Sequence, residues 1–513
     1  MPVRPFTRQQ PWLFPPTLDE MIPDDHAVRF IAAFVDNLSE EEWRKLEINL
    51  DGESRGAPPY DPRVLLGVWL YGFMTGDRST RKLEAACRDE IPYLWLTGWQ
   101  HPDHNTFWRF YKDHREEMRH LFKKTVKTAV TMNLIDLAVQ ALDGTKVAAN
   151  ASKDRTYDAS GLNKLLKRLD KVIDEMERQN EADNAPPPVR LPEALRKAEQ
   201  LREQVKAAMQ RLTENKEQER INLTDNNAEL MKSRQGIVPA YNVEAIASPA
   251  TIGEGEGKGK GMIITAVDAV QDPADNYQMV PMLDQAKENT GKQADYSLTD
   301  AGFHSGVNLA DCAKREMKVV MPESQDRMLQ NPYHKDKFVY DPATDTYICP
   351  EGKPLRFSFM EVQNKLIIMV FRNSGAVCRQ CKAFGICTKS GKYGREIRIG
   401  PFDEYLREHR KWMATEEAKA IYSLRKELIE PVFGIMKEQM GFRRFLLRGL
   451  KNVRAEAVMI ATAFNLRTLY REWRWRLTRK REVLTATIKI VKQNISIFGL
   501  FSLSEYCTSI QLT

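Results

Sequence analysis

The sequence predicts a mixed α/β protein that carries a separate all-helical segment near its N-terminal end. Apolar residues recur at helical spacing in residues 26 to 135 and again in residues 401 to 481. Between these regions lie the strand-like runs GIVPAYNVEAIA, GMIITAVDAV and MKVVMP, which are rich in apolar and β-branched residues. A predicted helix over residues 306 to 315 separates YSLTD from MKVVMP. Strand, helix and strand in that order predict a parallel pair within a mixed sheet.

Composition excludes a disordered chain and a membrane-spanning one. The chain has 513 residues, of which 42% are hydrophobic and 29% charged, so it can bury a sizeable core. No apolar run approaches the roughly 20 residues that cross a bilayer, and MPVRPFTRQQPW lacks the apolar core of a secretion signal. We therefore expect a soluble, intracellular protein. The formal charge of +7 permits a polyanionic partner without demonstrating one.

The N-terminal helical segment, residues 1 to 135, is predicted to be a DNA-binding domain. It contains the apolar run DPRVLLGVWLYGFMTG, the turn at Gly76-Asp77, the polar helix start RSTRKLE and the later PDHNTFWRF. Short helices joined by tight turns are typical of helix-turn-helix proteins. A helical packing domain with incidental arginines fits the same pattern.

Residues 136 to 481 are predicted to form the main sheet domain with two insertions. In LIDLAVQALDGTKVAANAS a strand is expected to close at Asp143-Gly144, which places Asp143 at a strand end or hairpin. Residues 160 to 220 predict a charged helical hairpin, because apolar positions step by three and four on both sides of three consecutive prolines. Its charges are most simply a solvated face. Residues 325 to 398 form a cysteine-rich insertion, and residues 482 to 513 a C-terminal tail of different character.

Three acidic residues have settings that suggest metal-dependent chemistry: Asp143 in ALDGTK, Asp300 in SLTDAGFHS and Glu430 in LIEPVFG. A mixed sheet gathers the ends of adjacent strands, and a helix packed on it can add a third carboxylate. Hard oxygen ligands clustered in this way suit Mg²⁺. Singly each acid is weak evidence, since Asp before Gly is more often a turn former.

The presumptive helix around Glu430 carries bases on both sides of the acid. Tyr422, Arg425 and Lys437 lie on it, and cations beside a metal-binding carboxylate could hold a phosphate backbone. Pro431 predicts a kink, and Glu427 is a rival ligand one turn earlier. A basic amphipathic helix with ordinary ion pairs is the alternative.

Four cysteines in the insertion are candidates for a structural Zn²⁺ site: Cys349, Cys378, Cys381 and Cys387, in CPEGK and CRQCKAFGIC. Four thiolates suffice for a closed tetrahedral site, which would stabilise a loop-rich segment with little core of its own. Free thiols or a redox pair remain alternatives, because the last two ligands lack the usual CxxC spacing.

The positive charge concentrates between residues 443 and 481, where twelve Lys or Arg residues face only Glu456 and Glu472. Trp473 and Trp475 alternate with arginines, so both phosphate pairing and stacking on bases are available. A solvated helix whose tryptophans pack on the core is the alternative.

Taken together, the motifs LDGTKVAANAS, PAYNVE, LTDAGFHS and IEPVFGIMKEQMGFRRFLLRGLKNVRAE resemble those of the DDE transposases of bacterial insertion sequences, in the subgroup with an InsH-like N-terminal domain. The resemblance covers residues 15 to 472. It implies an RNase H-like catalytic domain with Asp143, Asp300 and Glu430 as its metal-binding triad. The family has three residues between the signature arginine and the glutamate, whereas four separate Arg425 from Glu430. Either Arg425 is displaced along the helix or Lys426 takes its place.

The resemblance further implies a transposase that binds the terminal inverted repeats of its element, cleaves the DNA and joins it to a target. Two Mg²⁺ (or Mn²⁺) ions per active site and a DNA-bound homodimer belong to this expectation. So does a cytoplasmic, nucleoid-associated location in a bacterium. The DNA-binding side chains would be Tyr422, Arg425, Lys437, Arg443, Arg444 and Arg448. A nuclease that does not join DNA, and a domesticated DNA-binding protein, are the competing interpretations.

Overall fold

The computed structural model describes residues 16–50, 59–182, 193–215, 218–233, 236–255, 258–323, 330–363 and 365–497. The chain divides into two compact units. The first comprises Met1–Thr125, Ala250–Gly261 and Thr462–Thr513, and the second comprises Val126–Pro249 and Met262–Ala461. The predicted mixed α/β class is confirmed. Of the helices that the structure describes, none is both long and apolar enough to span a bilayer.

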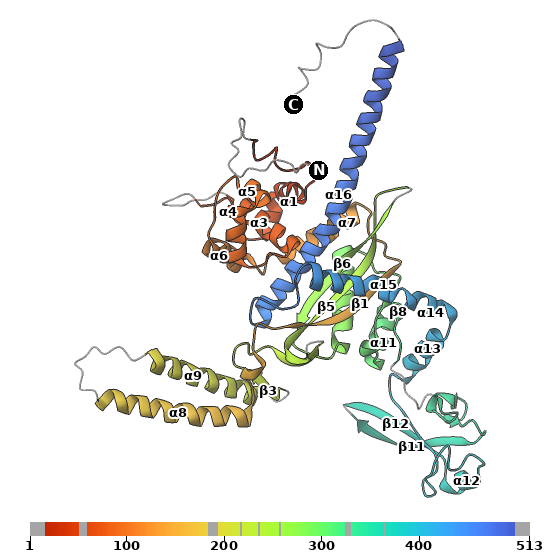
Figure 1. Ribbon diagram of the computed structural model, residues 1–513. Coiled ribbons are helices and arrows are strands. Elements are labelled where there is room, and N and C mark those ends of the chain that lie inside the picture. Colours follow the sequence, from red (N-terminus) through yellow and green to blue (C-terminus); the bar gives the residue numbers. More distant parts are fainter. Residues whose placement is uncertain are drawn as a thin grey trace, which may run out of the picture. The chain divides into compact units, whose positions relative to one another are not determined.

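The N-terminal part of the first unit is built from short helices (Figure 1). They are α1 (Ala27–Asp36), α2 (Glu40–Lys45), α3 (Pro62–Thr75), α4 (Thr80–Asp89), α5 (Ile91–Thr97), α6 (His104–His114) and the start of α7 (Arg119–Thr131). Helix α3 is buried continuously from Leu65 to Met74, so the other helices pack around it. The turn to α4 begins at Gly76, whose φ of 97° suits glycine. Two helices joined by a tight turn are therefore present.

The first unit also contains most of α16 (Leu450–Ile497), and here the tryptophans follow the packing alternative. The ring of Trp473 lies 5.8 Å from that of Phe30, and the ring of Trp475 closes over Gly253, where no Cβ would fit. Arg474 pairs with Asp25 at 2.9 Å. Part of the basic run is thus neutralised within the unit. The helix continues past Glu482 as far as Ile497, and the end of the predicted tail lies outside the described residues.

A mixed sheet forms the centre of the second unit, with strand order β4-β5-β1-β7-β8 and with β6 paired to β5. The strands are β1 (Val139–Ala148), β4 (Glu229–Ser233), β5 (Gly236–Ile252), β6 (Gly259–Val270), β7 (Tyr296–Leu298) and β8 (Val319–Val320). Strand β1 is antiparallel to β5 and parallel to β7, which is parallel to β8. Helix α11 (Gly306–Lys314) connects β7 to β8, so the predicted parallel pair is confirmed.

The predicted position of Asp143 at a strand end or hairpin is wrong. Strand β1 runs straight through Asp143 and Gly144, which pair with Ala245 and Glu244 of β5. The glycine serves packing instead of a turn, because a Cβ at this position would lie 2.7 Å from Oε1 of Glu244. A dipeptide that usually marks a turn is used here to seat a buried side chain on the neighbouring strand.

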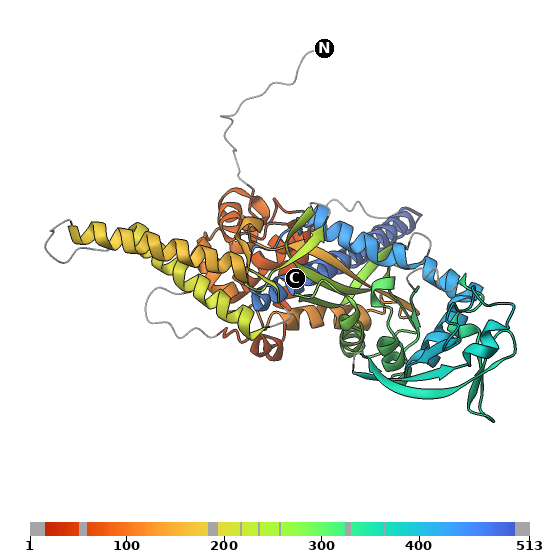
Figure 2. The same ribbon diagram turned by 90° about the horizontal axis from the view of Figure 1, so that it is seen from below.

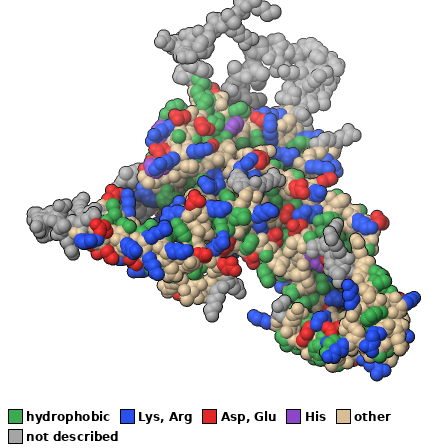
Figure 3. Space-filling model, turned by 60° about the horizontal axis from the view of Figure 1, so that its bottom comes forward, with side chains coloured by type: hydrophobic (Ala, Val, Ile, Leu, Met, Phe, Trp, Pro, Cys, Tyr) green, Lys and Arg blue, Asp and Glu red, His purple; other side chains and the backbone are tan. Residues whose placement is uncertain are grey.

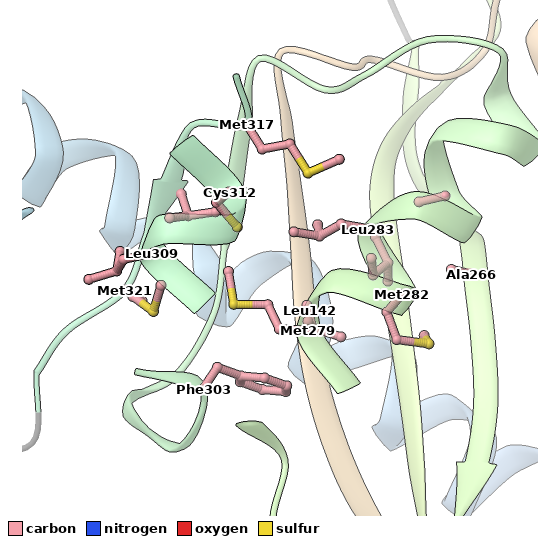
Figure 4. Packing of buried hydrophobic residues seen from close by; sticks show 13 residues of the cluster. Leu142, Ala266, Met279, Met282, Leu283, Phe303, Leu309, Cys312, Met317 and Met321 are labelled. Atoms are coloured by element: carbon pink, nitrogen blue, oxygen red, sulfur yellow. The ribbon is translucent and has the colours of Figure 1, made fainter. Parts of the chain in front are cut away.

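One face of the sheet packs on α10 (Met279–Thr290) and α11 through an apolar cluster (Figure 4). Leu142 and Ile246 come from the sheet, and methionines such as Met282 and Met317 fill the space between the elements. Burial of each large side chain contributes roughly 1.5–3 kcal/mol. This cluster holds β1, next to Asp143, against α10 and α11.

Two additions extend from the second unit. In the first, α8 (Ala159–Ala182) and α9 (Glu193–Glu214) run side by side as a hairpin, closed at its base by β2 (Thr156–Asp158) and β3 (Arg220–Asn222) (Figure 2). The second is an antiparallel sheet of order β13-β12-β11-β10-β9 with the short helix α12 (Gly375–Arg379). Its strands are β9 (Val339–Asp341), β10 (Thr346–Ile348), β11 (Pro354–Gln363), β12 (Leu366–Arg372) and β13 (Glu396–Ile399). The chain then returns through α13 (Asp403–Met413) to the main sheet.

Candidate active site

Asp143 and Asp300 lie next to each other because two parallel strands carry them in register. Ala141 of β1 pairs with Leu298 of β7, and each acid follows two residues later. Adjacent strands are about 4.8 Å apart, so the two carboxylates are neighbours. Burial, and to a smaller extent the charge of Asp300, raise the pKa of Asp143 to about 6. A cation placed next to Asp143 and Asp300 would therefore stabilise their ionised forms.

Arg425 supplies one such charge. Its Nη2 lies 2.9 Å from Oδ2 of Asp143, and both side chains are mostly buried. The guanidinium lowers the pKa of Asp143, against the effect of burial. Helix α14 (Glu416–Ser423) ends just before Arg425, where α15 (Arg425–Gly434) begins. This break accommodates the additional residue before Glu430, and Arg425, not the exposed Lys426, contacts the acid.

Tyr422, at the end of α14, belongs to the same group of side chains. Burial raises its pKa, and the charges of Asp300 and Asp143 raise it further. Because the charges of both carboxylates raise the pKa of Tyr422, its phenol lies near Asp143 and Asp300. The structure thus brings Tyr422 and Arg425 to the side of the acid pair.

Glu430 lines a cavity of about 850 Å³ together with Asp143, Lys437 and Arg443. Pro431 lies inside α15, which passes into the π-helical turn η6 (Ile435–Gln439). The Nζ of Lys437 donates to Oγ1 of Thr145 and, at 3.3 Å, to the backbone carbonyl of Lys146, so this lysine is anchored to β1. Glu427, the rival ligand, is exposed and is not among the residues that line the cavity.

The remaining predicted DNA-binding residues, Arg444 and Arg448, line a second cavity of about 500 Å³. Lys153 and Arg155 line it too, and Ala148 borders both cavities. The Nε of Arg448 donates to the carbonyl of Asn150 at 2.9 Å, which holds the side chain against the wall. The basic residues after Glu430 are therefore divided between two adjoining cavities.

Sequence reasoning missed a buried polar network beside Gly144. Burial, followed by the nearby Asp275, raises the pKa of Glu244 to about 9. The side-chain amide of Asn242 donates to both acids, and Lys146 Nζ lies 2.9 Å from Oδ1 of Asp275. The available signal was PAYNVE, a motif in which a polar and an acidic residue two apart face one side of a strand.

The donor set of the acid pair fits a divalent cation, since two adjacent carboxylates at a cavity wall are hard oxygen ligands with unbalanced negative charge. Glu430 shares the cavity with Asp143. Within the described ranges, however, no three His, Cys, Asp or Glu side chains are arranged to hold a metal ion. Asp143 and Asp300 form the adjacent pair, and Glu430 lines the cavity that Asp143 also lines.

The four cysteines of the insertion line one small cavity of about 20 Å³. Burial raises the pKa of Cys387, and the other three cysteines raise it further. Backbone N–H groups donate to Cys349 Sγ at 3.2 Å and to Cys378 Sγ at 3.3 Å. None of the four forms a disulfide bond, and zinc stays a prediction.

Two family models match the chain. A transposase DDE domain matches residues 348–470, which include Tyr422, Arg425, Glu430 and Lys437. A transposase domain (DUF772) matches residues 16–113. Both matched families are transposase domains, so the chain is similar to DDE transposases at both ends of the region that the sequence motifs cover. No curated protein matches it. A DDE domain implies an RNase H-like fold and the use of divalent metal ions. The mixed sheet with its flanking helices is consistent with that fold, although it precedes the matched residues in the chain.

Proposed function

We propose that this transposase binds the terminal inverted repeats of its insertion sequence, cleaves the DNA at the element's ends and transfers them to a target. The observation that supports the proposal is the register of β1 and β7, which sets Asp300 beside Asp143. Asp143 lines the same cavity as Glu430. A site of this kind has the carboxylates and cations that metal-dependent in-line phosphoryl transfer needs.

Asp143, Asp300 and Glu430 would hold two Mg²⁺ or Mn²⁺ ions, which when bound would activate the attacking oxygen and stabilise the departing one. Arg425 keeps Asp143 ionised before DNA and metal arrive, because its guanidinium lowers the pKa of that carboxyl. Lys437 and Arg443 line the same cavity and offer positive charge to a phosphate backbone. Tyr422 packs beside the acids and orients the scissile region.

The partners follow from this chemistry. Double-stranded DNA would be recognised mainly by the N-terminal helical domain, while phosphate contacts near the cavities fix its register. Two DNA ends must be joined in one reaction, so we propose a homodimer in the DNA-bound state. We also propose that Cys349, Cys378, Cys381 and Cys387 bind a structural zinc ion, which would stabilise the insertion without taking part in catalysis.

The test is Mg²⁺-dependent nicking of a plasmid that carries the element's ends, with wild-type and Asp300→Ala proteins in parallel. We expect nicking by the wild type alone, because the variant loses one of the two adjacent carboxylates. Equal activity in both proteins contradicts the proposal. Strand-transfer products distinguish the transposase from a nuclease that only hydrolyses DNA.

A further inference from the structure

We propose that the first half of helix α8, together with the second cavity, forms a binding surface for the phosphate backbone of double-stranded DNA outside the active-site cavity. The inference rests on the proposed function in one respect, namely that the protein acts on DNA. It assigns a role to the helical hairpin, whose charges the sequence alone attributes to a solvated face.

The charge of α8 is unevenly distributed along the helix. Residues 159 to 171 carry four cations and one acid, whereas residues 172 to 182 carry one cation and four acids. A helix charged only for solubility has no need of this separation. The half next to the sheet is therefore positive, and the half next to the hairpin tip is negative.

The four cations of the first half form one stripe. Lys164, Lys167, Arg168 and Lys171 are spaced at i, i+3, i+4 and i+7, which places them along a single face of the helix. All four are exposed, and among the described residues none of them forms an ion pair. Lysine and arginine side chains are visible along the hairpin in Figure 3.

The apolar side of the same helix has a separate task. Leu162, Leu165 and Leu169 belong to or pack against the apolar cluster between α8 and α9. The hairpin is thus held together without the basic stripe. Substitutions within the stripe leave this packing untouched.

The stripe continues from the second cavity. Lys153 and Arg155 line that cavity, and the chain then passes through β2 directly into α8. Arg444 and Arg448 line the same cavity, which shares Ala148 with the active-site cavity. Lys153 and Arg155 of the cavity wall and Lys164 of the stripe therefore lie close together in the chain, with the exposed acids Asp154 and Asp158 among them.

A DNA duplex has the chemistry that fits this surface. Residues 159 to 171 extend over about 18 Å of helix, the rise of about five base pairs. Exposed lysines that lack acidic partners gain free energy by releasing counterions from phosphates. A second protein with an acidic face is the competing occupant, and binding measured with DNA alone separates the two.

The experiment compares two variants of the full-length protein, each with three cations changed to glutamine. The stripe variant is Lys164→Gln, Arg168→Gln and Lys171→Gln. The matched control, near the hairpin tip, is Arg178→Gln, Arg196→Gln and Lys197→Gln, all of them exposed. Glutamine preserves helix propensity, so circular dichroism should report equal helix content. Affinity for a duplex of unrelated sequence is measured without metal over a range of salt concentrations.

Salt dependence is measured as the slope of the logarithm of the binding constant against the logarithm of the salt concentration. We expect the stripe variant to reduce the magnitude of this slope by up to about 2.7, that is, roughly 0.9 for each lost phosphate contact. At low salt the stripe variant should bind at least tenfold more weakly than the wild type. The control should behave like the wild type. Equal salt dependence in the stripe variant and the control overturns the inference. So does normal DNA binding accompanied by loss of self-association, which would assign the surface to a second copy.

Failure of this inference is distinguishable from failure of the proposed function. DNA binding without metal does not depend on the carboxylates. The affinity of the stripe variant is therefore interpretable whether or not the Asp300→Ala protein nicks DNA. A further readout uses duplexes lengthened by six base pairs on either side of the cleavage site. One of the two extensions should tighten binding by the wild type and by the control, and neither should tighten binding by the stripe variant.

Discussion

The buried acid Glu244 should make the stability of this protein fall as the pH rises. Its side chain is fully buried beside Asp275, and its pKa lies near 9, against an ordinary value of about 4.5. Between these two values the folded state keeps a proton that the unfolded chain releases. The contribution of this residue to stability is therefore largest below pH 4.5 and declines as the pH rises toward 9.

The magnitude follows from the shift. Between pH 4.5 and pH 9, each pH unit lowers the free energy of unfolding by roughly 1.4 kcal/mol for one proton. At pH 7 the free energy of unfolding is therefore about 3 kcal/mol lower than at pH 4.5. Glu244→Gln keeps the shape and remains neutral, and its amide can donate to Asp275. We expect the variant to melt on the order of 5 °C above the wild type at pH 8, with little difference at pH 5.

The assay is differential scanning calorimetry of both proteins between pH 5 and pH 8.5. Glu416→Gln serves as the control, because this carboxylate is 91% exposed and its loss should give a small change that does not vary with pH. A Glu244→Gln protein that melts below the wild type at pH 8, or with the same difference at both ends of the range, refutes the reasoning. Either result would mean that Glu244 is ionised in the folded state.

Three further predictions concern the site and the insertion. Glu430→Gln should reduce the rate of Mg²⁺-dependent nicking at least a hundredfold. The rate of Glu427→Gln, a change on the same helix, should stay within about threefold of the wild type. Similar losses in both variants would exclude a special role for Glu430. Arg425→Met should raise the pKa of Asp143 above its present value of about 6. As the pH is lowered, nicking activity should therefore begin to fall at a higher pH in the variant than in the wild type. An unchanged pH profile would mean that the Arg425–Asp143 ion pair does not contribute to catalysis. Cys381→Ser should reduce bound zinc, measured by atomic emission, from about one ion per chain to none, and a wild-type protein without zinc contradicts the assignment.

Local patterns in the sequence determined much of this protein. Helical spacing predicted the N-terminal helices and the charged hairpin, and strand, helix and strand in series predicted the parallel pair of β7 and β8, because these features depend on residues a few positions apart. The motif settings also singled out Asp143 and Asp300, which the sheet register brings together, and Glu430, which lines a cavity with Asp143. The family resemblance then supplied their expected roles.

Other features were decided only by contacts between distant parts of the chain. Asp143 lies within a strand because Gly144 makes room for Glu244, which is 100 residues further on. Arg425 reaches Asp143 although a helix break shifts its spacing from Glu430. The tryptophans of α16 pack on aromatic and glycine residues hundreds of positions away. Periodicity records which face of an element is apolar, whereas the partner that covers that face, and the charge that balances a buried acid, depend on tertiary packing.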